Sequence, residues 1–108
     1  MKPAKSLFLA CVLFAGLAHA QPYPAKPIRL IVGIAPGGGL DASTRIVAGG
    51  LSKVVNQQVL VENRAGAGGT IAASVVAAAA PDGYTLLYGS TSLMIAPGIY
   101  DNLTFDPV

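Results

Sequence analysis

The sequence of 108 residues is poor in the side chains that carry most catalytic and metal chemistry. It has one cysteine, one histidine and no tryptophan, and only 11% of its residues are charged. A single cysteine cannot form an internal disulfide, and one histidine with one cysteine is too small a set for a usual zinc site. We therefore expect no metal and no cofactor. The net charge is +2 and no block of like charges is present, so we also expect no nucleic-acid partner.

The first twenty residues have the pattern of a secretory signal peptide. Two lysines precede the apolar segment LFLACVLFAGL, residues 7–17, and AHA follows at residues 18–20. The apolar segment is shorter than the roughly 20 residues that cross a bilayer, so export to the periplasm with cleavage after Ala20 is expected. Cleavage would remove Cys11 and His19, and with them any thiol or imidazole for nucleophilic catalysis.

Beyond this segment the chain alternates between strand and helix patterns. Residues 21–27, QPYPAKP, contain three prolines and predict an extended leader. Short apolar runs predict strands, and longer segments with helical spacing or alanine richness predict helices. The predicted strands are 28–34, 59–61 and 84–88, and the predicted helices are 41–55 and 70–80. This order predicts an α/β fold, a βαβαβ unit with a parallel sheet and right-handed crossovers.

Two details of this pattern can be checked in a structure. The first helix is predicted from apolar residues at helical spacing, although Gly49 and Gly50 each cost about 1 kcal/mol relative to alanine. Those apolar residues are Ile46, Val47, Leu51, Val54 and Val55. The tail after residue 92 has mixed turn signals, and we predict no further element there.

Three loops follow the predicted strands at the end of the sheet where parallel α/β folds bind ligands. In the first, APGGGLD, Gly37, Gly38 and Gly39 allow backbone N–H groups to approach an anion at a helix N-terminus. The alternative is that the glycines only make the turn and Asp41 only caps the helix. The segment has neither the Gly-Lys-Ser/Thr ending of a P-loop nor G-x-G-x-x-G spacing, which argues against a nucleotide.

The second and third loops offer backbone and hydroxyl donors. Gly68, Gly69 and Thr70 form either a second anion-binding turn or only a tight connection. Ser90 and Thr91 can donate to a carboxylate or make local turn bonds. Ser90 does not lie in a nucleophile-elbow motif and has no histidine to activate it, so we expect no catalytic residue and no enzyme.

The remaining charged and aromatic side chains have structural interpretations first. Arg45 lies four residues after Asp41, which favours an intrahelical ion pair over ligand contact. Glu62 and Arg64 flank an asparagine at a strand end and are interpreted as loop-fixing residues. Two tyrosines, at positions 84 and 88, share a face of the third strand, where core packing is expected and a pocket wall is the alternative.

Four ordered blocks resemble the extracytoplasmic solute receptors of tripartite tricarboxylate transporters, the Bug-type family. They are YPAKPIRLIVGIAPGGGLDASTR, VLVENRAGAGG, APDGYTLLYGST and APGIYDNLTFDPV. The chain departs from the family pattern at Leu40, where a small or hydroxylated residue is common, and at Ala96. The resemblance implies a two-domain periplasmic-binding-protein-like fold of type II, of which residues 28–108 would be the N-terminal part of domain 1, without domain 2.

The resemblance also implies a function. Such receptors close over a small carboxylate or related organic solute and deliver it to a membrane permease. The carried-over contacts are the residues of the three loops: Gly37, Gly38, Gly39, Asp41, Gly68, Gly69, Thr70, Ser90 and Thr91. One wall of the cleft would bind weakly or not at all, and an interaction module, a non-functional remnant or an enzyme for a phosphorylated substrate are the alternatives.

Overall fold

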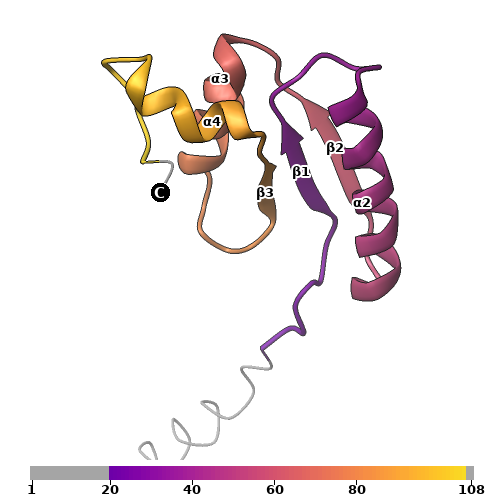
Figure 1. Cartoon of the computed structure of the whole chain (residues 1–108). Helices are drawn as coiled ribbons and strands as arrows, with labels where there is room; N and C mark the ends of the chain where they lie inside the picture. Colours follow the sequence, from indigo (N-terminus) through magenta and orange to yellow (C-terminus); the bar gives the residue numbers. More distant parts are fainter. Residues whose placement is uncertain (1–19, 107–108) are drawn as a thin grey trace, which may run out of the picture.

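A computed structural model describes residues 20–106 of the chain (Figure 1). The predicted signal peptide, apart from Ala20, lies outside the described residues. Three strands form one sheet, and helices connect them and follow them. The strands are β1 (Ile28–Val32), β2 (Val59–Asn63) and β3 (Thr85–Tyr88), and the helices are α2 (Gly39–Val55), η2 (Ala67–Gly69), α3 (Thr70–Ala77), α4 (Thr91–Ile95) and η3 (Ala96–Gly98).

The sheet has the strand order β2-β1-β3, and β1 pairs in parallel with both neighbours. Ile28 is opposite Val59 in the first pair, and Arg29 is opposite Thr85 in the second. All three strands therefore end at the same edge of the sheet, which is uppermost in Figure 1. The predicted α/β fold with a parallel sheet is confirmed.

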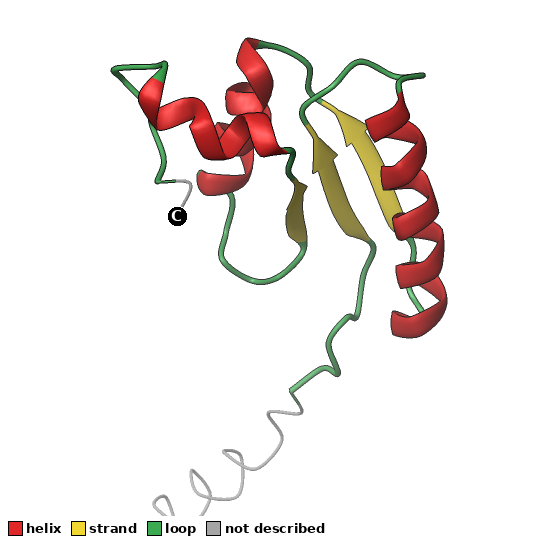
Figure 2. Ribbon diagram, in the orientation of Figure 1, coloured by secondary structure: helices red, strands yellow, loops and turns green. Residues whose placement is uncertain are grey.

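The core is built around β1, the central strand. Ile28, Leu30, Ile31 and Val32 are all buried, with Ile31 and Val32 fully inaccessible. Because successive side chains of a strand point to opposite faces, both faces of β1 are covered. Helices α2 and α3 both contact β1, α2 on the side of β2 and α3 on the side of β3 (Figure 2). This explains the nearly continuous apolar run in the sequence of β1.

Helix α2 buries a face of small and polar residues rather than its most apolar one. Its buried residues are Asp41, Thr44 and Ala48, which follow one another at helical spacing. Two apolar residues from which the helix was predicted, Ile46 and Val54, are 76% and 83% exposed. The helix itself is confirmed, and two other predicted apolar residues, Leu51 and Val55, continue the buried face at helical spacing and are half-buried.

The last third of the described chain departs most from the sequence-based expectation. Helix α3 ends at Ala77 instead of residue 80, and the Ala79 N–H donates to the carbonyl of Val76 in a tightened final turn. Pro81 restricts only the residue before it, Ala80, and so sets a limit to the helix without accounting for the end at Ala77. The segment after β3 was predicted to lack regular structure, and this is wrong: α4 begins directly after Ser90 and leads into η3.

The leader is held at the amino end of the sheet. The Tyr23 hydroxyl donates to the carbonyl of Gly83, and the Ala25 N–H donates to the Tyr84 hydroxyl at 2.8 Å. The two tyrosine rings meet edge to face, with centroids 5.0 Å apart, and the Lys26 ammonium lies 4.6 Å from the Tyr84 centroid. Tyr84 thus precedes β3 and packs against the leader instead of the core.

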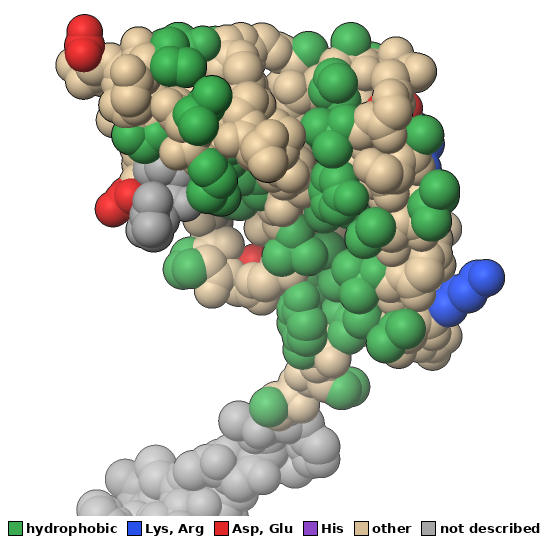
Figure 3. All heavy atoms as spheres, viewed as in Figure 1, with side chains coloured by type: hydrophobic (Ala, Val, Ile, Leu, Met, Phe, Trp, Pro, Cys, Tyr) green, Lys and Arg blue, Asp and Glu red, His purple; other side chains and the backbone are tan. Residues whose placement is uncertain are grey.

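Several large hydrophobic side chains are exposed on the surface. Figure 3 shows hydrophobic side chains gathered over the middle of the view, with few charged side chains among them. Leu60 on β2 and Val47 on α2 are among the large apolar residues that remain exposed, at 46% and 44%. Within residues 20–106, no helix has both the length and the hydropathy that a membrane crossing requires.

Candidate functional site

The three predicted loops meet at the carboxyl end of the sheet. A cavity there is lined by residues after β1, at the start of α2, at the end of η2, at the end of β3 and just after it, and in α4: Gly33, Leu40, Gly69, Leu87, Tyr88, Gly89, Ser90 and Leu93. Gly33 brings the first two loops together, because a Cβ built on it would lie only 2.6 Å from the Cα of Gly69. Only glycine fits at this crossing of two backbones.

The cavity itself has a volume of only about 10 Å³, roughly the space of a single water molecule. An organic solute cannot enter it and would have to lie over the loops. Gly37 and Gly39 are exposed at this edge, as are Gly68 and Thr91. The loops therefore form an open wall with several polar groups.

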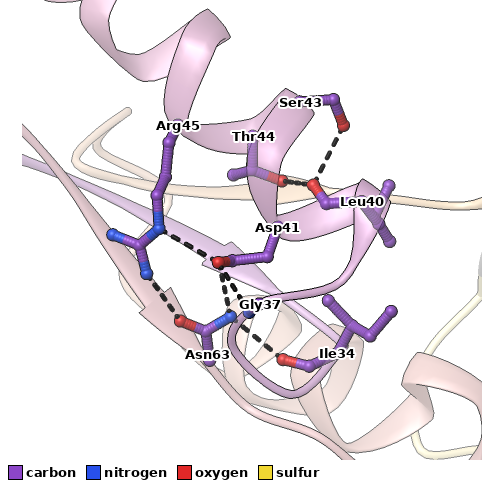
Figure 4. Close-up of polar contacts among 8 residues, drawn as sticks. All are labelled: Ile34, Gly37, Leu40, Asp41, Ser43, Thr44, Arg45 and Asn63. Atoms are coloured by element: carbon purple, nitrogen blue, oxygen red, sulfur yellow. Dashed lines mark hydrogen bonds and ion pairs between the residues drawn. The ribbon is translucent and has the colours of Figure 1, made fainter.

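A network of hydrogen bonds around Asp41 fixes the first loop (Figure 4). One carboxylate oxygen of Asp41 accepts from the Gly37 N–H at 3.0 Å and from Arg45 Nε at 3.1 Å. The other accepts from Asn63 Nδ2 at 2.9 Å, and the same nitrogen donates to the Ile34 carbonyl at 3.0 Å. The guanidinium of Arg45 also donates to Asn63 Oδ1 at 3.3 Å. The loop, α2 and the end of β2 are thereby tied together.

These bonds keep Asp41 ionised although it is only 4% exposed. The hydrogen bond from Asn63, followed by those from Arg45 and the Gly37 amide, lowers the pKa of Asp41 to about 2. The predicted ion pair between Asp41 and Arg45 is confirmed. It also engages Arg45, so the cation closest to the first loop is matched by an internal carboxylate.

The start of α2 retains amide groups without internal partners. Gly38 precedes the helix and supplies no side-chain cap. The first intrahelical bond of the helix is donated by the Ala42 N–H to the Gly38 carbonyl at 3.0 Å, so the amides of Gly39 and Leu40 come before it. With the partial positive charge of a helix N-terminus, these amides suit an acceptor such as a carboxylate.

In the second loop most of the predicted donors are already engaged. The Gly69 N–H donates to the Gly66 carbonyl at 3.0 Å, and the Thr70 hydroxyl donates to the Ala67 carbonyl at 2.9 Å. Thr70 is also buried, at 9% exposure. The carbonyl of Gly68 accepts from Ser92 of the third loop at 3.2 Å. The second loop therefore offers few free donors, and its main role is to shape the wall and to contact the third loop.

The third loop has two adjacent hydroxyls in different states. Ser90 Oγ lies 2.6 Å from Ser92 Oγ, within hydrogen-bond distance. Thr91 is exposed, and its hydroxyl makes no hydrogen bond within residues 20–106. The predicted site residues thus differ: Gly39 and Thr91 keep a donor without a partner in the described residues, whereas most of the others use theirs internally. The engaged residues are Gly37, Asp41, Gly69, Thr70 and Ser90, and the carbonyls of Gly38 and Gly68 accept bonds from Ala42 and Ser92.

Sequence reasoning missed the residues that hold the wall together. Asn63 joins the first loop to β2, Ser92 joins the third loop to the second, and Gly33 allows the first and second loops to touch. Asn63 directly follows the strand run VLVE, and a polar side chain at a strand end could have indicated a contact with the neighbouring loop. Ser92 is the last of three adjacent hydroxyl residues after the third strand, whereas Gly33 carries no such local signal.

Glu62, expected to fix a loop, mainly pairs with a neighbouring strand. Its carboxylate accepts two bonds from Arg29 of β1, at 2.6 and 2.8 Å, and a longer one from Arg64 at 3.5 Å. The bond from Arg29 is the main cause of the lowered pKa of Glu62. Among residues 20–106, no group of three or more His, Cys, Asp or Glu side chains is placed to hold a metal ion.

Sequence comparisons place this arrangement in a family. The profile of the tripartite tricarboxylate transporter family receptor, TctC, matches residues 43–108. The chain is 47% identical over 107 residues to a UPF0065 protein of Bordetella bronchiseptica, covering 95% of this chain and 32% of that protein. It is 44% identical over 93 residues to protein BugT of Bordetella pertussis, covering 86% and 28%. The chain spans about a third of the length of these curated relatives.

Solved structures agree with the sequence comparisons. Periplasmic binding protein BugD superposes with a TM-score of 0.76 at 39% identity, over 79% of this chain and 28% of that one. MatC of Rhodopseudomonas palustris, solved with bound malate, gives 0.74 at 36% identity over 79% and 29%. A second R. palustris protein, solved with adipate, gives 0.67 at 35% identity over the same shares.

The chain belongs to the tripartite tricarboxylate transporter receptor family. The members to which it is similar are solute-binding receptors and not enzymes.

Proposed function

We propose, from this family membership, that the chain forms one wall of a periplasmic receptor that captures a small carboxylate for the permease of a tripartite transporter. The observation that carries the proposal is the convergence of three strand-end loops on one cavity. Solved relatives that contain malate and adipate support a carboxylate as the ligand.

The chemistry of the wall suits a carboxylate held by neutral donors. The amides at the start of α2 and the hydroxyl of Thr91 can donate to it, directly or through water. Arg45, the nearest cation to the first loop, is paired with Asp41 at 3.1 Å. We therefore expect binding to depend on donor geometry more than on net charge, and to change little with ionic strength.

Location in the periplasm is the second part of the proposal. Residues 1–20 would act as a signal peptide, and cleavage after Ala20 would leave Gln21 at the start of the leader. Ala20 and Gln21 are exposed and lie outside any helix or strand. Intact-mass measurement of the protein secreted to the periplasm tests this, and a mass that retains residues 1–20 would contradict it.

A single wall should bind weakly. The resemblance implies a receptor that closes over its solute between two domains, and residues 21–108 alone would then offer only one side of the contacts. We expect a dissociation constant in the millimolar range or weaker, equivalent to about 4 kcal/mol or less of binding free energy. Titration of the ¹⁵N-labelled protein with malate or adipate should shift the amide resonances of the three loops and leave those of the leader unchanged.

Calorimetry would detect the result that contradicts this expectation. Micromolar binding of a carboxylate by residues 21–108 would show that the wall is a complete site, and would refute the expectation of weak binding. Shifts confined to residues away from the three loops would refute the proposed location of the site.

A further inference from the structure

The hydroxyl groups of the third loop form a directed chain. Ser90 Oγ and Ser92 Oγ are 2.6 Å apart, and Ser92 Oγ lies 3.2 Å from the carbonyl oxygen of Gly68. A carbonyl oxygen can only accept a hydrogen bond, so the Ser92 hydroxyl must donate its proton to Gly68. A hydroxyl has one proton, and the proton between the two serines therefore comes from Ser90.

The direction of these two hydrogen bonds determines whether the Ser90 hydroxyl can act as a donor or an acceptor toward a ligand. Its proton points to Ser92, and the part of its oxygen that remains free is a lone pair. Ser90 is half-buried and lines the cavity beside Gly33 and Gly69. The Ser90 hydroxyl therefore offers no proton to a carboxylate oxygen, whereas a hydroxyl or ammonium group of a ligand finds an acceptor in it.

The neighbouring residue has the opposite character. Thr91 is exposed and its hydroxyl makes no hydrogen bond within the described part of the chain, so it can donate to a carboxylate oxygen. The carboxylate donors of the wall thus lie near an acceptor, the Ser90 hydroxyl, which lines the cavity between the loops. A ligand that uses both kinds of group carries a hydroxyl or ammonium group as well as a carboxylate.

We propose that Ser90 is a specificity-determining residue that favours hydroxy- or amino-substituted carboxylates over unsubstituted ones. The inference rests on the proposed function, because it concerns the same wall. Ser92 is a positioning residue in this scheme, since it acts only by holding the proton of Ser90.

L-Malate and succinate are the probes, because they differ only in one hydroxyl group. Loop amide shifts of the ¹⁵N-labelled mature chain, measured over a millimolar titration, give both dissociation constants. Wild-type protein should bind malate about fivefold more tightly than succinate, the size expected for one hydrogen bond. Equal affinities for the two acids in the wild type would overturn the inference.

Two variants should change this ratio in different ways. Ser90→Ala removes the acceptor, so malate should weaken about fivefold while succinate stays unchanged. Ser92→Ala releases the Ser90 proton, so the Ser90 hydroxyl can donate to a carboxylate as well as accept, and succinate should bind more tightly than it does to the wild type. Succinate binding that is unchanged or weaker in Ser92→Ala would also overturn the inference, because a merely structural role of Ser92 predicts equal losses for both acids.

Ser52→Ala is the matched control. Ser52 also uses its hydroxyl internally, accepting from the Val59 N–H at 3.0 Å, but at the far end of α2. The ratio of malate to succinate affinity in Ser52→Ala should equal that of the wild type. If neither acid shifts any loop amide in the wild type, the proposed function itself fails, and this result is distinct from binding without preference.

Discussion

The two ends of the parallel sheet are built by opposite means. At the amino end, the rings of Tyr23 and Tyr84 pack edge to face, and the Lys26 ammonium lies over the Tyr84 ring. The Tyr23 hydroxyl donates to a backbone carbonyl and the Tyr84 hydroxyl accepts from a backbone N–H, so each makes a hydrogen bond. At the carboxyl end, the wall is made of glycines, hydroxyls and helix starts, and several of its polar groups have no partner in the described residues.

The difference shows where the chain keeps capacity for a ligand. Backbone polar groups that lack a partner are unfavourable unless water or a ligand satisfies them, so proteins retain them where function requires it. At the amino end, the contacts of Tyr23, Ala25, Lys26 and Tyr84 anchor the leader. The carboxyl end keeps its open groups in place through a buried network around Asp41.

The largest effect should follow from Gly33→Ala, which breaks the carboxyl end at its closest contact. The added Cβ would lie 2.6 Å from the Gly69 Cα, a backbone atom that cannot rotate away. We expect a loss of about 1–3 kcal/mol in the free energy of unfolding, typical of overpacking. Urea denaturation followed by circular dichroism measures it.

Gly50→Ala is the control for this substitution. A Cβ on Gly50 would meet nothing within 4 Å, and the residue lies in the middle of α2. We expect a gain of about 0.5–1 kcal/mol, because alanine favours the helix. Equal losses in both variants would mean that the Gly33 contact has no special role.

Asn63→Ala should be next in size and should affect the wall more than the fold. It removes the bond to Asp41 and the bond to the Ile34 carbonyl, and leaves a carboxylate with fewer donors. We expect about 1–3 kcal/mol of destabilisation. Amide exchange measured by NMR should rise in the first loop and stay unchanged at Tyr84, and uniform acceleration would contradict the proposed local role.

The pH dependence of stability should reside at the carboxyl end. Asp41 has a pKa of about 2 when folded, against an ordinary value of 3.8, so the unfolded state binds its proton first. Its contribution is complete above about pH 4 and is lost as the pH falls from about 4 toward 2. Unfolding curves over this range should show a smaller pH dependence for Asp41→Asn than for the wild type.

Glu62→Gln measures the share of the other carboxylate, Glu62, in the pH dependence of stability. The pKa of Glu62 is also lowered, mainly by Arg29, so it contributes with the same sign. If Asp41→Asn left the pH dependence unchanged while Glu62→Gln removed it, the network around Asp41 would not be the acid-sensitive element.

Tyr84→Phe should have the smallest effect. It removes the bond from the Ala25 N–H but keeps the ring beneath Lys26. We expect about 0.5–1 kcal/mol of destabilisation and no change in the carboxylate-induced shifts of the loops. Altered ligand shifts in this variant would show that the two ends of the sheet are coupled.

Local patterns in the sequence were enough for most of the fold. The apolar run of β1, the strand run before Asn63 and the glycine-rich connections predicted the parallel α/β unit, and the starts of α2 and α3 lie within two residues of their predicted positions. Helix α4 was missed, although Ser90 followed by an apolar segment beginning at Leu93 is a helix-start pattern. Short helices are the hardest to recognise, because few residues carry the spacing.

The candidate site was predictable only as a set of loops. The sequence showed which residue types follow each strand, but it did not show that Gly69 and Thr70 use their donors locally, or that Ser92 reaches Gly68. Each of these depends on the distance between atoms that the folded backbone brings together.

The sequence by itself determined the periodicity, the turns and the family, because these depend on residues near one another and on their order. Tertiary structure alone decided which face of α2 is buried and which polar groups remain open. Asp41 meets Asn63 across 22 positions of the chain and is buried, while Ile46 and Val54 of the same helix are exposed. A buried carboxylate must be paired with hydrogen-bond donors, and only the folded chain brings those donors together.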